Sequence, residues 1–296
     1  MKNNFIFLYL AQKLPFLQMC VWSIRSLQKF GKFRILVIVN NLNEKRYLLK
    51  YLKEVDIKVI KVDIGKLNMW CWKPLLLKNL RLNYSNIIIS DVDIIWHKDP
   101  TALLKRIGNK TWFHKITSID PKEIIENLRN ENIPSRRIGL INMVRFFQQS
   151  KIINLPNFHV NVGLFSVSKY NFKLITERWF KYIKKMNNNE IMTEAIISIA
   201  LADLKIEPYC DIENIKHHFK SKKININYPI IKYQFLKNEK KGPHGYEYAT
   251  HYHGDQRIAM CIKAREYKID YNNFFLNIVF YTYFNKLKKF LLKKIW

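Results

Sequence analysis

The sequence predicts an α/β protein in which helices flank a mostly parallel sheet. Short apolar runs alternate with helix-like patterns through the first hundred residues, and this alternation is typical of β-α-β units. Two of the runs, Arg34–Val39 (RILVIV) and Asn86–Ser90 (NIIIS), are almost continuously apolar, as expected of strands buried on both faces. The composition is 48% hydrophobic and 14% aromatic, which supplies a core and excludes a disordered chain.

The first hundred residues are predicted to form strands and helices in strict alternation. The strands are expected at Phe5–Leu10, Arg34–Val39, Ile57–Val62 and Asn86–Ser90. The helices are expected at Pro15–Phe30, from about residue 41 through Leu52, and at Trp70–Leu82. Asp99-Pro100 ends the fourth strand region and is expected to start a short helix.

The rest of the chain is less regular. Residues 118–150 are polar and charged and are interpreted as an insertion. Beyond them the sequence predicts a strand at Val160–Val167, which Gly163 interrupts, and an extended segment at Tyr248–His253. Two helices are expected between these, at Asn171–Lys185 and Glu190–Leu204. We expect one domain over residues 1–258, followed by a basic helical tail at 259–296.

The tail alternates aromatic residues and lysines. Its apolar positions fall on one helical face, and its lysines fall largely on the others. The apolar face consists of Leu287, Phe290, Leu291 and Ile295. This pattern is typical of a helix lying in a membrane interface, and it equally fits a closing helix packed on its own domain. Both interpretations stay open.

The chain carries a formal net charge of +28. Such an excess of Lys and Arg can attract nucleic acid or the anionic surface of a membrane. The sequence is also rich in Lys, Asn and Ile together, a composition that biased codon usage produces. The charge alone therefore identifies no partner.

Four widely spaced cysteines argue against a disulfide scaffold or a metal-thiolate site. They favour a reduced, cytoplasmic setting, with peripheral attachment to the inner face of the membrane as a further hypothesis. The short apolar run at the N-terminus is interpreted as a core strand rather than a signal peptide. No stretch reaches the roughly 18 apolar residues expected of a spanning helix.

An acidic pair, Asp91-Val92-Asp93, directly follows the strand at Asn86–Ser90. In an extended chain, residues two apart point to the same side, so the two carboxylates are expected to converge. Ligands of parallel α/β sheets bind beyond the carboxyl ends of the strands, and this pair falls there. Two hard oxygen donors suit Mg²⁺ or Mn²⁺, which commonly keep substrate phosphate oxygens as further ligands. The alternative is an acidic turn in solvent, which the preceding apolar strand disfavours.

A second polar segment, HYHGDQR at 251–257, could complete such a site. An imidazole nitrogen of His251 can join the ligands of the ion, with His253 as the second candidate. Gly254 would let the backbone approach a ligand closely, and Arg257 offers a fork of donors for phosphate oxygens. Surface histidines are usually just solvated, so this segment predicts a site only together with the acidic pair.

The run NIIISDVDIIWHKDP at 86–100 resembles the DxD strand of GT-A glycosyltransferases. It is especially similar to the nucleotide-diphospho-sugar transferases of glycosyltransferase families 8 and 77, where an apolar strand, a DxD, a Trp-containing strand and a DP follow in this order. The resemblance continues, in the order of those families, at Trp72-Lys73-Pro74, at the strand NVGLF (161–165), at Thr193-Glu194-Ala195 and at the HxxGxxK-like segment from His251 to Arg257.

The resemblance implies a GT-A-like, Rossmann-like fold and a metal-dependent glycosyltransferase. The implied donor is a nucleotide-sugar, a UDP-sugar by family, and the implied acceptor is a hydroxyl of a glycan or a lipid-linked glycan. Families 8 and 77 retain the configuration of the anomeric carbon, so retention is implied here as well. Residues 1–100 would bind the nucleotide and residues 101–258 the acceptor. No nucleic acid partner is expected.

The resemblance also implies roles for particular residues. The metal, Mn²⁺ or Mg²⁺, would be held by Asp91, Asp93 and His251. The donor would be bound by Lys73, Asp91, Asn161, Gly163, Gly254 and Arg257. Glu194 is the carboxylate expected beside the reacting sugar carbon, as nucleophile, base or charge stabiliser. Its alternative role is a charge at a helix N-terminus.

The sequence departs from the family pattern on the acceptor side. Thr193 and Ala195 stand where carboxylates are common, Arg257 replaces a Lys, and the Pro-Trp usual after that position is absent. Two other classes remain as alternatives. A phosphatase of the haloacid dehalogenase type also places a DxD after an apolar strand, although its motif usually opens the catalytic domain. A basic nucleic-acid-binding protein would explain the charge, but no signature of one is present.

Overall fold

The computed structural model describes residues 5–61, 72–114, 116–118, 156–185, 193–209, 225–227, 232–234, 244–245, 248–252 and 260. These residues belong to two compact units. The first comprises Met1–Ala11, Phe33–Asp91 and Thr101–Ile212, and the second comprises Gln12–Lys32, Val92–Pro100 and Glu213–Trp296. The predicted division of the chain at residues 100 and 258 stays a prediction.

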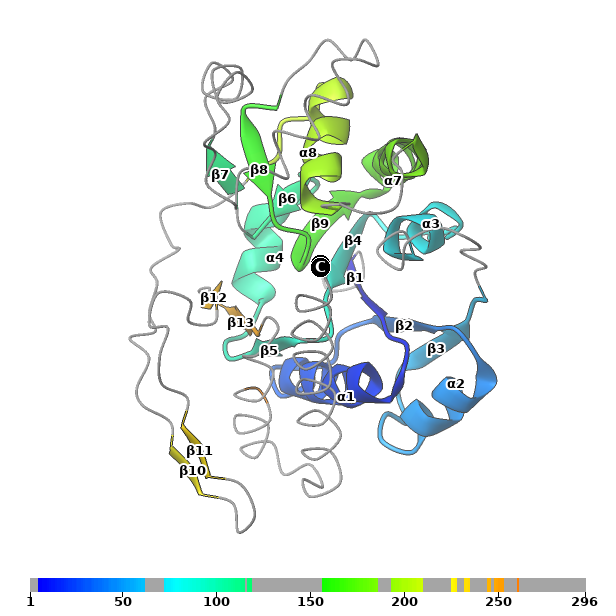
Figure 1. Ribbon diagram of the computed structural model, residues 1–296, viewed down its shortest axis with the longest axis vertical. Coiled ribbons are helices and arrows are strands. Elements are labelled where there is room, and N and C mark those ends of the chain that lie inside the picture. The colour runs from blue at the N-terminus through cyan, green and yellow to red at the C-terminus, as the bar shows by residue number, and fades with distance from the viewer. Residues whose placement is uncertain are drawn as a thin grey trace, which may run out of the picture. The chain divides into compact units, whose positions relative to one another are not determined.

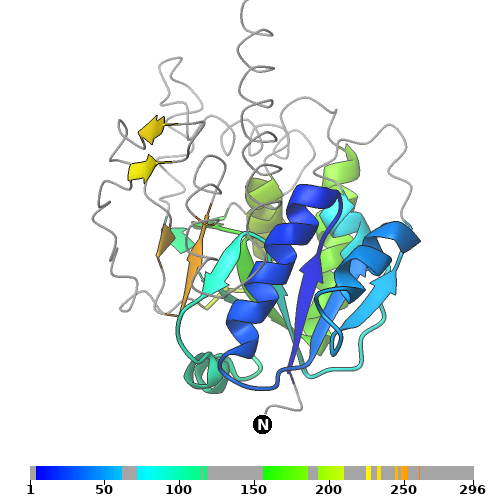
Figure 2. The ribbon, with the colours of Figure 1, turned by 90° about the horizontal axis from the view of Figure 1, so that it is seen from below.

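A six-stranded mixed sheet forms the first unit (Figure 1). Its strands are β1 (Phe5–Leu10), β2 (Ile35–Val39), β3 (Asp56–Val59), β4 (Asn86–Ser90), β6 (Trp112–Phe113) and β9 (Leu164–Ser168). The strand order is β3-β2-β1-β4-β9-β6. The pairs β1/β2, β2/β3 and β1/β4 are parallel, and Figure 2 shows β1 and β3 running in the same direction. Because β9 runs antiparallel to both β4 and β6, the predicted α/β class with a mostly parallel sheet is confirmed in a mixed form.

Helices cover one face of this sheet. Side chains of α3 (Trp72–Lys78), α7 (Lys169–Lys185) and α8 (Thr193–Asp203) form one buried cluster with alternate residues of β1, β2, β4 and β9. Figure 1 shows α3 and α7 next to each other beside β4 and β9. The intervening strand residues, such as Phe7 and Val37, are also buried. The strands are therefore buried on both faces, which explains why β1 and β4 have the bounds that their apolar runs predict.

The first unit also contains the helices α2 (Leu42–Leu49) and α4 (Thr101–Ile107) and a small two-stranded sheet of β7 (Ile116–Ser118) and β8 (Phe158–Val160). The side chain of Asn41 caps α2 by accepting a hydrogen bond from the backbone N–H of Glu44 at 2.9 Å. The strand character expected at 160–167, with an interruption at Gly163, is present as two strands, β8 and β9. A turn at residues 161–163 separates β8 from β9, because the side chain of Asn161 accepts the N–H of Gly163 at 2.9 Å and bends the chain there.

A buried hydroxyl joins β8 to α8. Ser198 Oγ accepts the backbone N–H of Val160 at 3.1 Å and donates to the carbonyl of Glu194 at 2.7 Å. Ser198→Ala is expected to lower the free energy of unfolding by about 1–3 kcal/mol, because the buried N–H loses its acceptor. The higher helix propensity of Ala offsets about 0.5 kcal/mol of this loss. The shift in the urea unfolding midpoint measures the effect.

Ser166 provides the matched control. It is as fully buried as Ser198, but its hydroxyl makes no hydrogen bond with the described residues. Ser166→Ala should therefore leave stability within about 1 kcal/mol of the wild type or raise it. Equal losses in the two variants would show that the Ser198 bond does not contribute.

The second unit is built around α1 (Leu14–Gln28) and β5 (Ile94–Trp96). The hydroxyl of Ser26 accepts the backbone N–H of Trp96 at 2.9 Å and ties the helix to the strand. β13 (Ala249–His251) pairs antiparallel with β5, and β12 (His244–Gly245) pairs antiparallel with β13. β10 (Asn225–Asn227) and β11 (Lys232–Gln234) form a separate hairpin pair. Trp96 is fully buried, so its predicted role in core packing is confirmed.

The N-terminal apolar run forms β1, the predicted core strand. Cys20 is a free, fully buried thiol on α1, and burial raises its pKa, so it stays protonated and inert. No helix within the described ranges is long and apolar enough to span a bilayer. The insertion at 119–150 and the tail beyond residue 260 lie outside the described residues.

Candidate active site

The site begins where β4 ends. Strands β2 and β3 lie on one side of β1 and β4 lies on the other, so the chain changes direction across the sheet between β1 and β4. In doubly wound sheets, ligands bind outside the carboxyl ends of the strands at this switch point. Asp91 is the first residue after β4, and its backbone N–H donates to the carbonyl of Gly163 at 2.6 Å. The predicted position of Asp91 beyond the strand end is confirmed.

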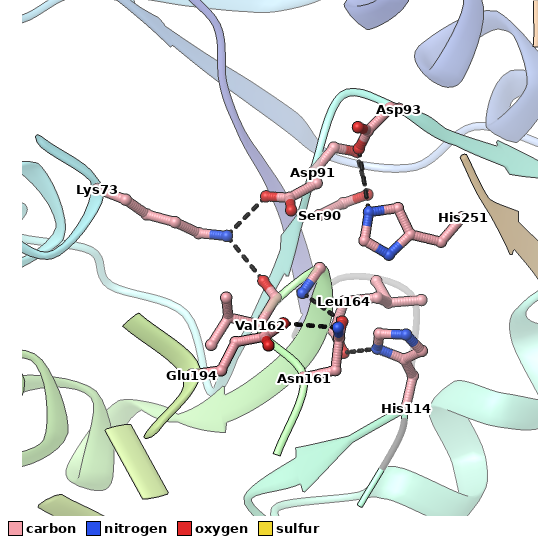
Figure 3. Close-up of polar contacts among 11 residues, drawn as sticks. Lys73, Ser90, Asp91, Asp93, His114, Asn161, Val162, Leu164, Glu194 and His251 are labelled. Atoms are coloured by element: carbon pink, nitrogen blue, oxygen red, sulfur yellow. Dashed lines mark hydrogen bonds and ion pairs between the residues drawn. The ribbon is translucent and has the colours of Figure 1, made fainter. Parts of the chain in front are cut away.

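Lys73 contacts Asp91. The residue lies in the first turn of α3, and its ammonium Nζ is 2.6 Å from Oδ1 of Asp91 and 2.7 Å from the carbonyl oxygen of Val162 (Figure 3). The same Nζ stands 5.6 Å from the centre of the Phe165 ring. Both side chains of the ion pair keep some exposure, 17% for Lys73 and 36% for Asp91. A charged group at this position is accessible to a ligand.

Asp93 and His251 form a second, more deeply buried pair. Nε2 of His251 is 3.1 Å from Oδ1 of Asp93, and the two side chains are 3% and 5% exposed. The pairing of β13 with β5 sets this contact, because His251 lies opposite Ile94 and the N–H of Tyr252 donates to the carbonyl of Asp93 at 2.8 Å.

The acidic segment does not continue the strand. Residues 92 and 93 form a turn between β4 and β5, so the expectation of an extended Asp-Val-Asp is wrong. The two carboxylates still converge, because the turn brings residues two apart in the chain toward one point. One ligand atom from each of Asp91, Asp93 and His251 lies within 4.8 Å of the other two. Two carboxylate oxygens and one imidazole nitrogen therefore form a group able to hold a cation.

Asn161 and Glu194 form the next part of the site. Asn161 lies in the turn before β9, and Glu194 lies in the first turn of α8. Nδ2 of Asn161 donates to Oε1 of Glu194 at 2.7 Å. Gly163, also predicted as a site residue, is in the same turn and accepts the N–H of Asp91 through its carbonyl. Glu194 lies in the first turn of α8, where a negative charge also suits the helix dipole. The structure thus brings Lys73, Asp91, Asn161, Gly163 and Glu194 into one hydrogen-bonded network.

His114 contacts the backbone of Leu164, the residue after Gly163, although sequence reasoning did not select it. It is 3% exposed, and its Nδ1 is 2.6 Å from the carbonyl oxygen of Leu164. A carbonyl only accepts, so Nδ1 carries the proton. A lone histidine after a two-residue strand carries no sequence signal for this placement.

The remaining predicted site residues, Gly254 and Arg257, lie outside the described residues, as does His253. His251 faces Asp93, and the preference for His251 over His253 as a metal ligand stays a prediction.

No protein-family model matches the sequence, and no curated protein matches it either. Two solved structures of LgtC align with part of this chain. The first is an active-site mutant of LgtC, with 11% sequence identity and a TM-score of 0.43. The alignment covers 67% of this chain and 70% of the LgtC chain. The galactosyltransferase LgtC in complex with donor and acceptor sugar analogues has 14% identity, a TM-score of 0.41 and the same coverage of each chain. At such values neither likeness assigns an activity or a residue role to this chain, so the site is interpreted from its own geometry.

Proposed function

We propose that the chain is a metal-dependent glycosyltransferase of the GT-A type. It would move a sugar from a nucleotide-diphosphate donor, a UDP-sugar by sequence resemblance, to a hydroxyl of a glycan or lipid-linked acceptor. The observation that carries the proposal is the group of Asp91, Asp93 and His251, whose ligand atoms lie within 4.8 Å of one another where the buried strand β4 ends. The sequence motifs around these residues support the same class.

The donor set fits Mn²⁺ or Mg²⁺. Carboxylate oxygens suit both ions, and Mn²⁺ accepts an imidazole nitrogen more readily than the harder Mg²⁺ does. Burying the charge of the Asp93 carboxylate is unfavourable, and a cation beside Asp93 and His251 would offset part of that penalty. When bound, such an ion neutralises charge on a diphosphate leaving group. Holding that ion would be the task of Asp91, Asp93 and His251.

The remaining residues would act on the donor and its sugar. Lys73, whose ammonium already faces a carboxylate and a carbonyl oxygen, would present its positive charge to the donor phosphates. Asn161 and Gly163 would line the sugar side of the donor. Glu194 would place its carboxylate beside the anomeric carbon during a retaining transfer, and Gly254 with Arg257 would bind the diphosphate.

A thermal-shift screen of nucleotide-sugars with and without Mn²⁺ tests the proposal. One donor is expected to raise the Tm only when Mn²⁺ is present, since ligands that bind the folded state stabilise it by mass action. Release of phosphate from a generic phosphomonoester, with no donor-dependent stabilisation, would favour a phosphatase instead. Salt-sensitive binding of oligonucleotides that Asp91→Ala leaves unchanged would favour a nucleic-acid-binding protein.

A further inference from the structure

The turn at residues 161–163 connects to three separate residues of the candidate site. The side chain of Asn161 donates to Glu194, the carbonyl of Val162 accepts from Lys73 at 2.7 Å, and the carbonyl of Gly163 accepts the N–H of Asp91 at 2.6 Å (Figure 3). Each residue of the turn therefore holds a different part of the site. Two of these contacts use backbone carbonyls, which a substitution does not remove. Asn161 is the residue of the turn whose contact with the site depends on its side chain.

The amide of Asn161 has a fixed orientation. Its Oδ1 accepts the N–H of Gly163 at 2.9 Å, so its NH₂ group is the one that faces Oε1 of Glu194 at 2.7 Å. The amide accepts through its oxygen and donates through its nitrogen, so it can bridge Gly163 and Glu194 in this way. A carboxylate at position 161 could keep the bond to Gly163 and would lose the bond to Glu194.

The backbone around Glu194 is held independently of Asn161. Ser198 Oγ accepts the N–H of Val160 and donates to the carbonyl of Glu194, so one hydroxyl fixes the start of α8 against the end of β8. The hydrogen bond from Asn161 to Oε1 restricts rotation of the Glu194 carboxylate about its own side-chain bonds.

We infer that Asn161 is a positioning residue, which orients the carboxylate of Glu194 for sugar transfer. The inference rests on the proposed function and deepens it, because it assigns Asn161, proposed to line the sugar side of the donor, an action on the reaction through Glu194. A carboxylate held in one rotamer avoids reorganisation at the moment of reaction, and loss of such orientation slows the chemical step more than it weakens substrate binding.

Asn161→Asp tests this inference in the full-length chain. It replaces the amide donor with a second carboxylate, which repels the carboxylate of Glu194 instead of holding it. We expect kcat to fall by about 10- to 100-fold. The KM for the donor should stay within about threefold, and the Mn²⁺-dependent Tm shift with donor should persist. Unchanged kcat, or a lost Tm shift with a raised KM, would overturn the positioning role.

Asn171→Asp is the matched control. Its Nδ2 donates to Oγ1 of Thr111 at 3.1 Å, and a hydroxyl can donate as readily as it accepts. An Asp at position 171 therefore keeps a partner, and kcat should stay within about twofold of the wild type.

A double-mutant cycle identifies the route of the effect. Glu194→Gln keeps an acceptor for Asn161 and removes the carboxylate, so kcat should fall at least as far as in Asn161→Asp. If Asn161 acts through Glu194, the double variant should be no slower than Glu194→Gln alone. The double variant also restores a donor–acceptor pair between positions 161 and 194, which keeps the test valid if Asn161→Asp folds poorly. Additive losses would overturn the inference.

A wild-type protein without donor-dependent stabilisation or turnover would overturn the proposed function itself.

Discussion

Asp93→Asn is expected to abolish Mn²⁺-dependent binding of the donor and to lower kcat/KM for sugar transfer by on the order of 10²–10³-fold. The amide has nearly the shape of the carboxylate, so the contact with His251 at 3.1 Å can be kept. The amide lacks the negative charge with which the carboxylate of Asp93 would bind a cation. The side chain is 5% exposed, so water does not readily replace that charge. The Tm shift given by Mn²⁺ with donor, and initial rates of transfer, measure the two effects.

Asp56→Asn is the control for charge removal. Asp56 is an exposed carboxylate at the start of β3, in the sheet but outside the site. Its variant should keep the Mn²⁺-dependent Tm shift and the wild-type kcat/KM within about twofold. An Asp93→Asn protein that folds and still binds the donor only with Mn²⁺ would refute the assignment of the metal site.

Lys73→Met is expected to raise the affinity for Mn²⁺ alone and to lower kcat/KM for sugar transfer. The ammonium is 2.6 Å from the carboxylate of Asp91, so it competes with any cation that this carboxylate would bind. For partly exposed charges such competition amounts to about 1 kcal/mol, and Mn²⁺ alone should bind the variant about fivefold more tightly. The donor loses a positive charge that would face its phosphates, so kcat/KM should fall on the order of 10²-fold. Titration of Mn²⁺ by calorimetry, with and without donor, separates the two effects.

Lys78→Met is the matched control on the same helix. Its ammonium lies 4.5 Å from the centre of the Phe180 ring, and the residue is exposed. Both the Mn²⁺ affinity and kcat/KM of this variant should stay near the wild-type values. Weaker binding of Mn²⁺ to Lys73→Met would mean that the lysine holds Asp91 in place for the ion, and competition between the two cations would then be excluded.

The sheet could be predicted from the sequence because its strands are buried on both faces. β1 and β4 begin and end as their apolar runs indicate, since a strand without a solvent face leaves a continuous hydrophobic signal. The short elements were harder. Gly163 indicated the break between β8 and β9, but the hydrogen bond from Gly163 to Asn161 at this break is a local side-chain contact that hydrophobic periodicity does not report.

The site could be predicted only in part. Asp91 was found from the residues alone, because its position follows from the strand before it. His251, the neighbour of Asp93, was a candidate from its residue type, and the family resemblance strengthened it, but no local pattern indicates that β13 pairs with β5 across more than 150 residues of chain. The contact of Lys73 with the carbonyl of Val162 could not be predicted, because every residue carries a backbone carbonyl and the residue type therefore does not mark the acceptor.

The reversed direction of β9 has a consequence for how this rim of the sheet could diversify. If the strand next to β4 were parallel to it, that strand would end beside the end of β4 and would need a crossover connection to reach this position. Since Ser90 pairs with Leu164, the antiparallel strand instead delivers its beginning, and with it a short turn, to the end of β4. Replacements in that turn would leave the hydrogen-bond ladders of β1, β2 and β4 untouched. The ligand preference of the proposed site could thus change through a few residues without disturbing the parallel core.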